Sequence, residues 1–298
     1  MKSLWRLMKA AIEGWQSDFA SSMGAALAYY TVFSIAPLLV IVIAIAALAF
    51  GHSTAQQEIM SQARDLFDAE GAGALETMLE NARKPGQGIV ASALSLVALV
   101  FGAIGVFNEL ESDLNRIWKV PSTRHAGWWG VVRGRLLSFG MIIAIGFLLL
   151  VSLVLSATLA ALGSYWSGVF AQLEFLLQAA NFALSFGVVT VLFAIIYKFL
   201  PQTRIEWGDV WIGAAVTALL FSIGKLLIGL YLGKSSVASS YGAAGSLVIL
   251  LLWVYYSAQI FLLGAEFTKA YADSHGSLRN APAAPPRPSP EDRIGTQR

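Results

Sequence analysis

Several polar side chains interrupt segments that are otherwise apolar enough to cross a bilayer. Residues 21–40, SSMGAALAYYTVFSIAPLLV, carry Tyr29, Tyr30, Thr31, Ser34 and Pro37. Proline cannot donate a backbone hydrogen bond and kinks a helix, and in lipid the freed carbonyl needs another donor. Two interpretations fit: a kinked helix whose hydroxyl groups bond to neighbouring helices, or a helix that lines a polar cavity.

The last apolar segment, 241–267, has the same character. It contains Tyr255, Tyr256 and Gln259, and Glu266 lies near its end. Gln259 is an amide in hydrocarbon and must find a partner. Polar side chains within spans generally face a bundle interior or a cavity. We therefore expect the tyrosines and Gln259 to line, with the polar residues of 21–40, a shared candidate substrate cavity, and Glu266 to be a headgroup-binding or gating charge.

Charged residues elsewhere supply further candidates of that kind. Lys225 lies within an apolar run and is either an anchor at the membrane surface or a cation for a lipid phosphate. The segment FNELESDLNRIWKVP (107–121) contains Glu109, Asp113 and Arg116 at helical spacing. It is either a salt-bridged elbow or an ion or proton site.

The composition argues against a catalytic or metal centre. The chain has no cysteine, and its three histidines, His52, His125 and His275, fall in three separate loops without ligand spacing. The net charge of +2 is too small for a nucleic-acid binder. We expect no enzymatic activity, nuclease activity included, and no metal, cofactor or nucleic-acid partner.

Hydropathy indicates an all-α membrane protein. The 298 residues are 57% hydrophobic and 13% charged, and the mean hydropathy is +0.66. A helix needs about 20 apolar residues to cross a bilayer. Six segments qualify, with the third and fourth separated by a predicted turn at 163–175: they are 24–50, 89–109, 136–162, 177–200, 207–232 and 241–267.

The distribution of basic residues predicts the orientation. If the N-terminus is cytoplasmic, most of the 20 lysines and arginines lie in inside segments. The outside loops then hold only Arg64, Arg83, Lys84 and Lys234. Cytoplasmic loops carry an excess of Lys and Arg, so both termini are expected in the cytoplasm.

Three further segments flank or connect the spans. Residues 1–20 have apolar positions at helical spacing and predict an amphipathic helix, lying either in the membrane interface or on the protein's own cytoplasmic loops. The outside loop 51–88 predicts short helices that cap the bundle or gate it. The Pro-rich, polar tail 272–298 predicts disorder, following a membrane domain at 21–271.

The chain resembles the YihY/BrkB family of bacterial inner-membrane proteins, formerly catalogued as ribonuclease BN. The resemblance rests on SSMGAALAYYTVFSIAPLL (21–39), LNRIWKVP (114–121), WIGAAVTALLFSIGKLLIGLYL (211–232) and YGAAGSLVILLLWVYYSAQIFLLGAEFT (241–268). It implies six spans, a location in the bacterial inner membrane and a connection with envelope lipids.

Two functions are compatible with these features. The first is a transporter, flippase or scramblase of an envelope lipid or other amphiphile, because polar groups at mid-depth can accommodate a headgroup while few buried charges argue against a strongly ion-coupled pump. The second is a scaffold in an envelope-assembly complex that transports nothing. The expected partners are membrane lipids, further copies of the chain or envelope proteins.

Overall fold

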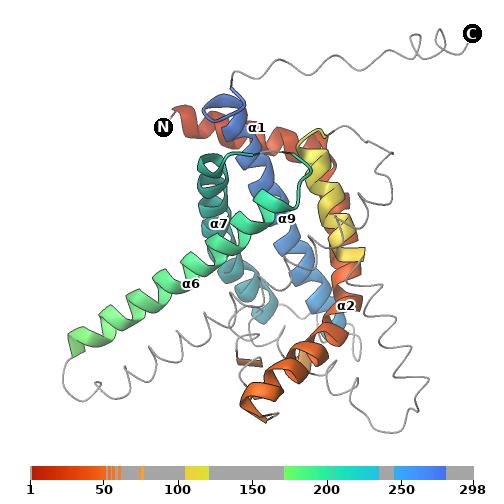
Figure 1. The fold of residues 1–298 in the computed structure, drawn as a ribbon, viewed down its shortest axis with the longest axis vertical. Coiled ribbons are helices and arrows are strands. Elements are labelled where there is room, and N and C mark those ends of the chain that lie inside the picture. Colours follow the sequence, from red (N-terminus) through yellow and green to blue (C-terminus); the bar gives the residue numbers. More distant parts are fainter. Residues whose placement is uncertain are drawn as a thin grey trace, which may run out of the picture.

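The long elements in the described part of the chain are all helices (Figure 1). The computed structural model describes residues 2–51, 53–54, 56–57, 60–61, 73, 75–76, 105–120, 171–203, 205–234 and 245–279. Its long helices are α1 (Lys2–Ser17), α2 (Ala20–Phe50), α6 (Ala171–Phe199), α7 (Trp207–Lys234) and α9 (Gly245–Ser274). A shorter helical segment covers 105–117.

Three described stretches are long and apolar enough to cross a membrane. They are Phe182–Phe199 in α6, Trp207–Tyr231 in α7 and Leu247–Ser274 in α9. They correspond to the last three spans predicted from the sequence. The predicted first span, 24–50, lies within the helix α2. The predicted span 136–162 lies outside the described residues, as does 89–109 apart from its helical end at 105–109.

Helix α9 packs against α1, α2 and α7. Its apolar residues contribute to three clusters of buried side chains, which contain Phe261 and Leu262, Ile249 and Leu250, and Phe267. A helix that is apolar on all sides is expected at the centre of a membrane bundle. Since three other helices pack on α9, it lies at the centre of the described part of the bundle.

The α7–α9 contact is interlocked by threonines and glycines. Thr268 of α9 lies over Gly213 of α7, and Thr217 of α7 lies over Gly264 of α9. Each threonine hydroxyl donates to a carbonyl of its own helix, with Thr217 Oγ1 2.7 Å from the Gly213 oxygen and Thr268 Oγ1 2.7 Å from the Gly264 oxygen. Small residues allow membrane helices to approach closely. Both hydroxyls are thus satisfied by backbone carbonyls of their own helices.

Helix α6 joins this pair through its C-terminal half. The hydroxyl of the fully buried Tyr197 donates to the Phe261 carbonyl of α9 at 2.7 Å and lies 3.2 Å from Thr217 Oγ1 of α7. The rest of α6 diverges from the bundle (Figure 1), and Phe182 is 65% exposed. A tyrosine at the point where three helices meet therefore fixes one end of α6.

Helix α1 lies across one end of the bundle, hereafter the α1 end (Figure 1). Its Leu7 and Ala11 are buried against Phe267 of α9. Its neighbouring face exposes Trp5 (73%) and Ile12 (45%), together with Leu4. The predicted N-terminal amphipathic helix is confirmed as a helix, and its apolar surface is wider than the part that α9 covers.

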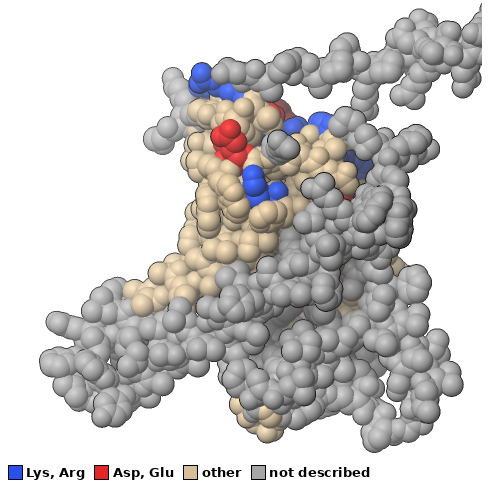
Figure 2. Space-filling view, in the orientation of Figure 1, with Lys and Arg blue, Asp and Glu red and all other residues tan. Residues whose placement is uncertain are grey.

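The described surface is apolar along the helices and charged at the α1 end. On the face in Figure 2 the Lys, Arg, Asp and Glu side chains gather at that end. Helix α7 exposes large apolar side chains along its length, among them Leu219, Leu226 and Leu230. Exposed apolar side chains at helical spacing are expected where lipid replaces water.

Some element boundaries differ from the sequence-based expectations. Helix α6 begins at Ala171, so the end of the predicted turn at 163–175 is helical. Helix α9 continues to Ser274, beyond the end of the predicted span at 267. Residues 275–279 fold into turns, so the first part of the tail 272–298, which was predicted to be disordered, has defined structure. Hydropathy marks where a helix leaves lipid, but the helix continues because Ala272 is buried in the protein's own core.

Candidate functional site

At the α1 end, four polar side chains make up what we call the polar junction: Asp18, Lys119, Gln259 and Glu266. They come from the α1–α2 connection, from segment 105–120 and from α9. Asp18 and Glu266 are 7% and 3% exposed. Buried charges within membrane proteins are costly and usually functional, which makes the polar junction the first candidate site.

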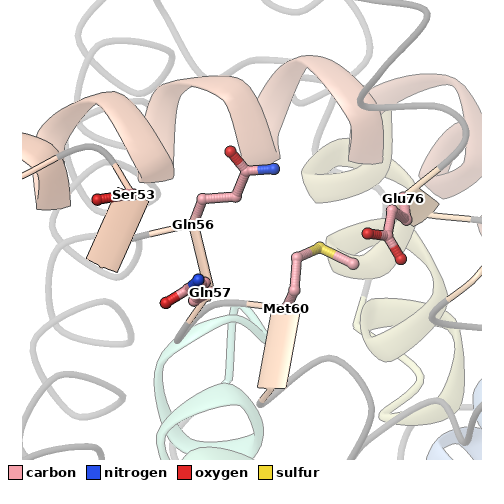
Figure 3. A pocket seen from close by; sticks show the side chains of 5 residues that line it. All are labelled: Ser53, Gln56, Gln57, Met60 and Glu76. Carbon is pink, nitrogen blue, oxygen red and sulfur yellow. The ribbon is translucent and has the colours of Figure 1, made fainter.

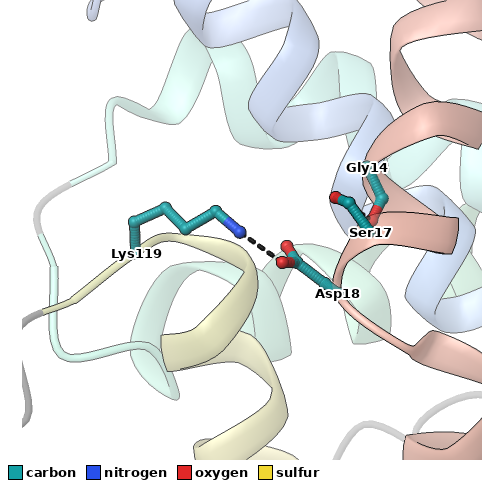
Figure 4. Close-up of polar contacts among 4 residues, drawn as sticks. All are labelled: Gly14, Ser17, Asp18 and Lys119. Atoms are coloured by element: carbon teal, nitrogen blue, oxygen red, sulfur yellow. Dashed lines mark hydrogen bonds and ion pairs between the residues drawn. The ribbon is translucent and has the colours of Figure 1, made fainter.

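An ion pair joins two chain segments at the centre of the junction. Lys119 donates through Nζ to Asp18 Oδ1 (Figure 4). The two residues are 101 positions apart in sequence. The lysine side chain is 46% exposed and the aspartate side chain 9% exposed, so the pair lies at the edge of the buried region. The pair connects the end of α1 to segment 105–120.

The backbone on both sides of this ion pair is strained. Phe19 has φ 60° and Lys119 has φ 52°. Each residue follows the last turn of a helix, the position where glycine is common because it has no Cβ. The left-handed conformation costs roughly 1–2 kcal/mol for a non-glycine residue. Such strain is concentrated at functional sites.

Glu266 lies between Asp18 and Gly14. Its carboxyl is adjacent to that of Asp18 and also lies within the electrostatic range of Lys119 and Lys269. A Cβ atom at Gly14 would overlap Glu266 Oε2. Glu266 Oε1 and Asp18 Oδ2 are buried without a hydrogen-bond partner in the part of the chain that the structure describes. The two carboxyls are thus short of donors, with Lys119 alone bonding to one of them.

Gln259 connects α9 to the start of α2. Its Nε2 donates to the carbonyl oxygens of Ala20 at 3.4 Å and Ser21 at 3.5 Å. The amide sits over Gly24, where a Cβ would overlap it. The partner that the sequence required for this amide is therefore the first turn of α2. Its Oε1 is buried without a described partner.

A pocket of about 600 Å³ opens beside Glu266, between α1 and the end of α9. We call it the α1–α9 pocket. Charged side chains of both signs line it: Arg6, Glu266, Lys269 and Asp273. Gly14 and His275 also contribute to its wall. The pocket is a hollow in which a small polar group can be in contact with both cations and carboxylates.

Segment 105–120 carries the charged positions predicted from 107–121. Asp113 is buried, Glu109 is half-buried and Arg116 is exposed. Burial raises the pKa of Asp113 to about 7, the Glu109 carboxylate contributes in the same direction, and Arg116 opposes it. An acid with a pKa near 7 is protonated about half the time at neutral pH.

The same segment is attached to the loop between α6 and α7. Gln202 donates through its backbone nitrogen to Asn115 Oδ1 at 2.7 Å and through Nε2 to Glu111 Oε1 at 2.5 Å. With the Lys119–Asp18 pair, these bonds attach the segment to two other parts of the chain. Its partners, Asp18 and Gln202, are distant from the segment in sequence.

The polar residues of α2 do not gather around one described cavity. Tyr29 is 58% exposed beside Phe33, at 4.9 Å between ring centroids, and the ring of Tyr30 lies against Gly105. Ser34 is buried and donates to the Thr31 carbonyl at 3.1 Å, within its own helix.

Around Pro37 the backbone of α2 stays helical, and Figure 1 shows the helix bending along its course. The proline side chain and its surroundings lie outside the described residues. A bend in a proline-containing helix fits the kink expected from the sequence.

The remaining predicted positions lie on different sides of α9 and α7. Tyr256 contacts Gly224 of α7, whereas Tyr255 packs on the cluster of Ala28 and Val32 of α2. Lys225 is half-buried on α7, about 27 Å along the helix from Trp207 and thus far from the α1 end. Of the candidate residues, the structure brings only Gln259 and Glu266 into the polar junction.

The opposite end of the bundle contains a second pocket, which has one acidic residue, Glu76, in its lining. A pocket of about 510 Å³ is lined by Ser53, Gln56, Gln57, Met60 and Glu76 (Figure 3). Met60 and Leu75 of the loop 51–88 are buried with Ile43 of α2 and Ile249 of α9. These two described positions of the loop pack on α2 and α9.

Two members of the polar junction, Asp18 and Lys119, were absent from the sequence-based candidates. Lys119 belongs to the LNRIWKVP motif, and Asp18 is an acid directly before a long apolar helix. Those positions are the signals that could have identified them. No group of three His, Cys, Asp or Glu side chains able to hold a metal ion occurs among the residues described.

Comparison with known proteins supports the membrane assignment. A UPF0761 membrane protein of Acinetobacter baylyi is 25% identical over 276 residues, 92% of this chain and 64% of that protein. UPF0761 membrane proteins of Albidiferax ferrireducens and Alteromonas mediterranea are each 31% identical, over 60% and 59% of this chain and 42% and 58% of their own lengths.

The chain spans about two fifths to two thirds of the length of these relatives. No solved structure matches it. The family model described as virulence factor BrkB matches residues 11–288. The chain is a membrane protein that belongs to the BrkB (YihY/BrkB) family.

Proposed function

We propose that this protein moves an envelope lipid or another amphiphile between the leaflets of the bacterial inner membrane, as a transporter, flippase or scramblase. The observation that carries the proposal is the polar junction beside an open pocket at one end of a membrane helix. Buried carboxyl and amide oxygens without described partners are costly in lipid and are retained where they serve a polar ligand. The proposal requires no catalytic group.

The proposed topology has six spans with both termini in the cytoplasm, which puts the polar junction at the inner surface. The chain contains no cysteine, so single cysteines report position without background. Thiol reagents that cannot cross membranes should label Ser3→Cys and Ser274→Cys in inverted inner-membrane vesicles and leave them unlabelled in intact spheroplasts. Labelling of both positions in intact spheroplasts would reverse the orientation.

Reconstitution tests the transport itself. Fluorescent lipids of several headgroup classes are incorporated into proteoliposomes and into empty liposomes. A reductant that cannot cross the membrane is added outside, and the rate of fluorescence loss reports how fast lipids move from the inner to the outer leaflet. We expect transport of at least one class to be several-fold faster with protein and to fall strongly in Glu266→Gln. Glu13→Gln is the matched control, because that glutamate lies on α1 with its side chain 65% exposed. Rates equal to empty liposomes for every class would exclude the proposal.

A second function, a scaffold without transport, is favoured by the α7–α9 contact. That interface is interlocked by neutral groups, and α7 presents Leu226, Leu227, Leu230 and Tyr231 to its surroundings. An exposed apolar helix face can pack on another membrane protein or on a second copy of the chain. Stable co-purification of one envelope protein, lost when Leu226 and Leu230 are replaced, together with the absence of transport, would favour the scaffold.

A further inference from the structure

The α1–α9 pocket presents positive and negative side chains to the same space. Arg6 of α1 and Lys269 of α9 supply the positive charges. Glu266 and Asp273, one turn to either side of Lys269, supply the negative charges. A ligand with only negative charge would approach two carboxylates, and a ligand with only positive charge would approach two cations. A ligand that carries both charges can complement all four side chains.

Two neighbouring carboxyls, of which Glu266 lines the pocket, are short of hydrogen-bond donors within the described part of the chain. Glu266 is 3% exposed, and its Oε1 has no donor within the described part of the chain. Asp18, directly behind it, also has one oxygen without a donor there. Among the described residues, Lys119 forms an ion pair with one of these carboxyls, through Asp18 Oδ1. A primary ammonium carries three N–H donors and one positive charge, the two properties that this pair of carboxyls needs.

Lys269 offers a positive charge that can bind the phosphate of such a ligand. Among the residues that the structure describes, no ion pair within 4.0 Å joins its ammonium to Glu266 or Asp273. Arg6 lines the same pocket from α1. Phosphate oxygens bind most strongly to charged donors of this kind. The two cations therefore form an anion subsite adjacent to the carboxyl subsite.

Gly14 keeps the carboxyl subsite accessible from α1. A Cβ atom there would overlap Glu266 Oε2. Any larger residue would displace the carboxyl or fill the space in front of it. Gly14 is thus a position where substitution should block a ligand without changing any charge.

The exposed face of α1 places the pocket at headgroup level. Leu4, Trp5 and Ile12 are exposed on the helix that forms one wall of the pocket. In a membrane protein, an amphipathic helix with such a face lies in the interface between headgroups and acyl chains. Phosphate and amine groups of lipids occupy that layer.

We propose that the α1–α9 pocket binds the headgroup of an aminophospholipid, with its ammonium on Glu266 and its phosphate on Lys269 and Arg6. The proposal rests on the proposed function, since it names the substrate class that enters at this end. The chemistry is that of an amino-phosphate, which a lipid headgroup or a free amino-phosphate could supply, and we commit to the membrane lipid.

The test measures binding to the purified full-length chain in mild detergent. The probes are phosphatidylethanolamine, phosphatidylcholine and phosphatidylglycerol of equal acyl length, and soluble phosphoethanolamine. Bound lipid is counted by native mass spectrometry over a concentration series. We expect phosphatidylethanolamine to bind about tenfold more tightly than phosphatidylglycerol or phosphatidylcholine, because a charge-assisted hydrogen bond is worth roughly that factor.

Two substitutions should separate the two subsites. Glu266→Gln should remove the preference for phosphatidylethanolamine over phosphatidylglycerol, whereas Lys269→Gln should weaken both about equally. Glu13→Gln and Lys9→Gln are the matched controls, since these residues form an exposed ion pair on α1. Gly14→Ala should lower the affinity for phosphatidylethanolamine without altering charge. Size-exclusion profiles and helical circular dichroism establish that each variant is folded.

Each result bears on the proposal. Equal affinities for the three lipids, or a preference unchanged in Glu266→Gln, would overturn it. Binding of soluble phosphoethanolamine as tight as that of the lipid would replace the lipid by a soluble amino-phosphate. Selective binding without transport of any lipid would retain the site and reject the proposed function. Transport without selective binding would retain the function and reject the site.

Discussion

Helix α9 has two sides that differ in how they contact their neighbours. On the α7 side, Thr217 and Thr268 lie over glycines, and each hydroxyl is satisfied by a carbonyl. On the side of α1 and α2, the same helix presents Gln259 and Glu266, whose Oε1 atoms are buried without described partners. Both contacts use glycine to bring the backbones close together. The second leaves carboxyl and amide oxygens short of hydrogen bonds among the described residues.

The two sides of α9 therefore contribute differently, the α7 side to stability and the side of α1 and α2 to function. A neutral, satisfied interface contributes dispersion energy at no electrostatic cost, because nothing in it needs water or a ligand. An interface with unsatisfied carboxyls lowers stability and is retained where the groups act on something. We infer that α7 and α9 form the fixed part of the bundle, and that α1, the start of α2 and segment 105–120 form the part that interacts with a ligand.

The largest effect is expected on the α7 side. Gly213→Ala and Gly264→Ala each place a Cβ where a threonine of the facing helix lies, and backbones must separate to relieve the overlap. Overpacking of this kind costs about 1–3 kcal/mol per site, so the double variant should lose roughly 3 kcal/mol or more. The measurement is the free energy of unfolding in mixed micelles, followed by tryptophan fluorescence.

The control for this prediction lies on the same helix. A Cβ atom at Gly208 would meet no other atom within 4 Å, so Gly208→Ala should be neutral or stabilise by up to about 1 kcal/mol. If Gly213→Ala and Gly208→Ala have the same effect, the threonines and glycines do not lock α7 and α9 together.

The α1 end should instead show a dependence on pH. Burial raises the pKa of Asp113 to about 7, from an ordinary value of 3.8. Between these values the folded state keeps a proton that the unfolded state has released, so stability falls as the pH rises and levels off above about 7. Each pKa unit is worth about 1.4 kcal/mol, and we expect a decline of roughly 2–3 kcal/mol between pH 5 and pH 8.

Unfolding of the wild type and of Asp113→Asn across this pH range is the measurement. The variant should show a flatter profile and be the more stable of the two at pH 8. Glu13→Gln, which removes an exposed acid, should retain the wild-type profile. A slope that persists unchanged in Asp113→Asn would assign the effect to another group and weaken the contrast between the two sides.

Hydropathy and spacing predicted the long helices of the described part of the chain but not the polar junction. Long apolar runs are sufficient for α6, α7 and α9, because a helix is the structure that satisfies its backbone within lipid. The need of Gln259 for a partner also followed from its chemistry alone. The identity of that partner, the carbonyls of Ala20 and Ser21, did not, since it depends on how α9 packs on α2.

The polar junction was harder to predict because its members are far apart in sequence. Asp18 and Lys119 lie 101 positions apart, and no local pattern joins them. Tyr29 and Tyr30 were expected in a shared cavity with Tyr255 and Tyr256, but the position of a residue within the 3.6-residue period of its helix decides whether it faces lipid or protein. Tyr29 is 58% exposed for that reason.

The ion pair at the α1 end should give an intermediate effect. Lys119→Met leaves Asp18 buried without its cation, which we expect to cost about 1–2 kcal/mol, less than for a fully buried pair because the lysine is 46% exposed. Adding Asp18→Asn should recover most of the loss. The coupling free energy from the double-mutant cycle is compared with that of the exposed Lys9–Glu13 pair, expected near ~0.3 kcal/mol. Equal coupling in the two cycles would show that the junction pair is an ordinary surface contact.

The smallest effect concerns the strained backbone next to Asp18. Phe19 adopts φ 60° with its side chain 65% exposed, so it bears the steric cost of the left-handed conformation without burying its ring. Asparagine tolerates this conformation better than a bulky residue. Phe19→Asn should therefore stabilise the folded state by about 0.5–1 kcal/mol in unfolding experiments. Ile12→Asn, at an exposed helical position of α1, should show no such gain. If Phe19→Asn stabilises the chain and slows transport, the strain at the α1 end holds the polar junction in the geometry that its function requires. If Phe19→Asn does neither, the strain is a local feature of the helix end. The two sides of α9 then differ by their polar groups alone.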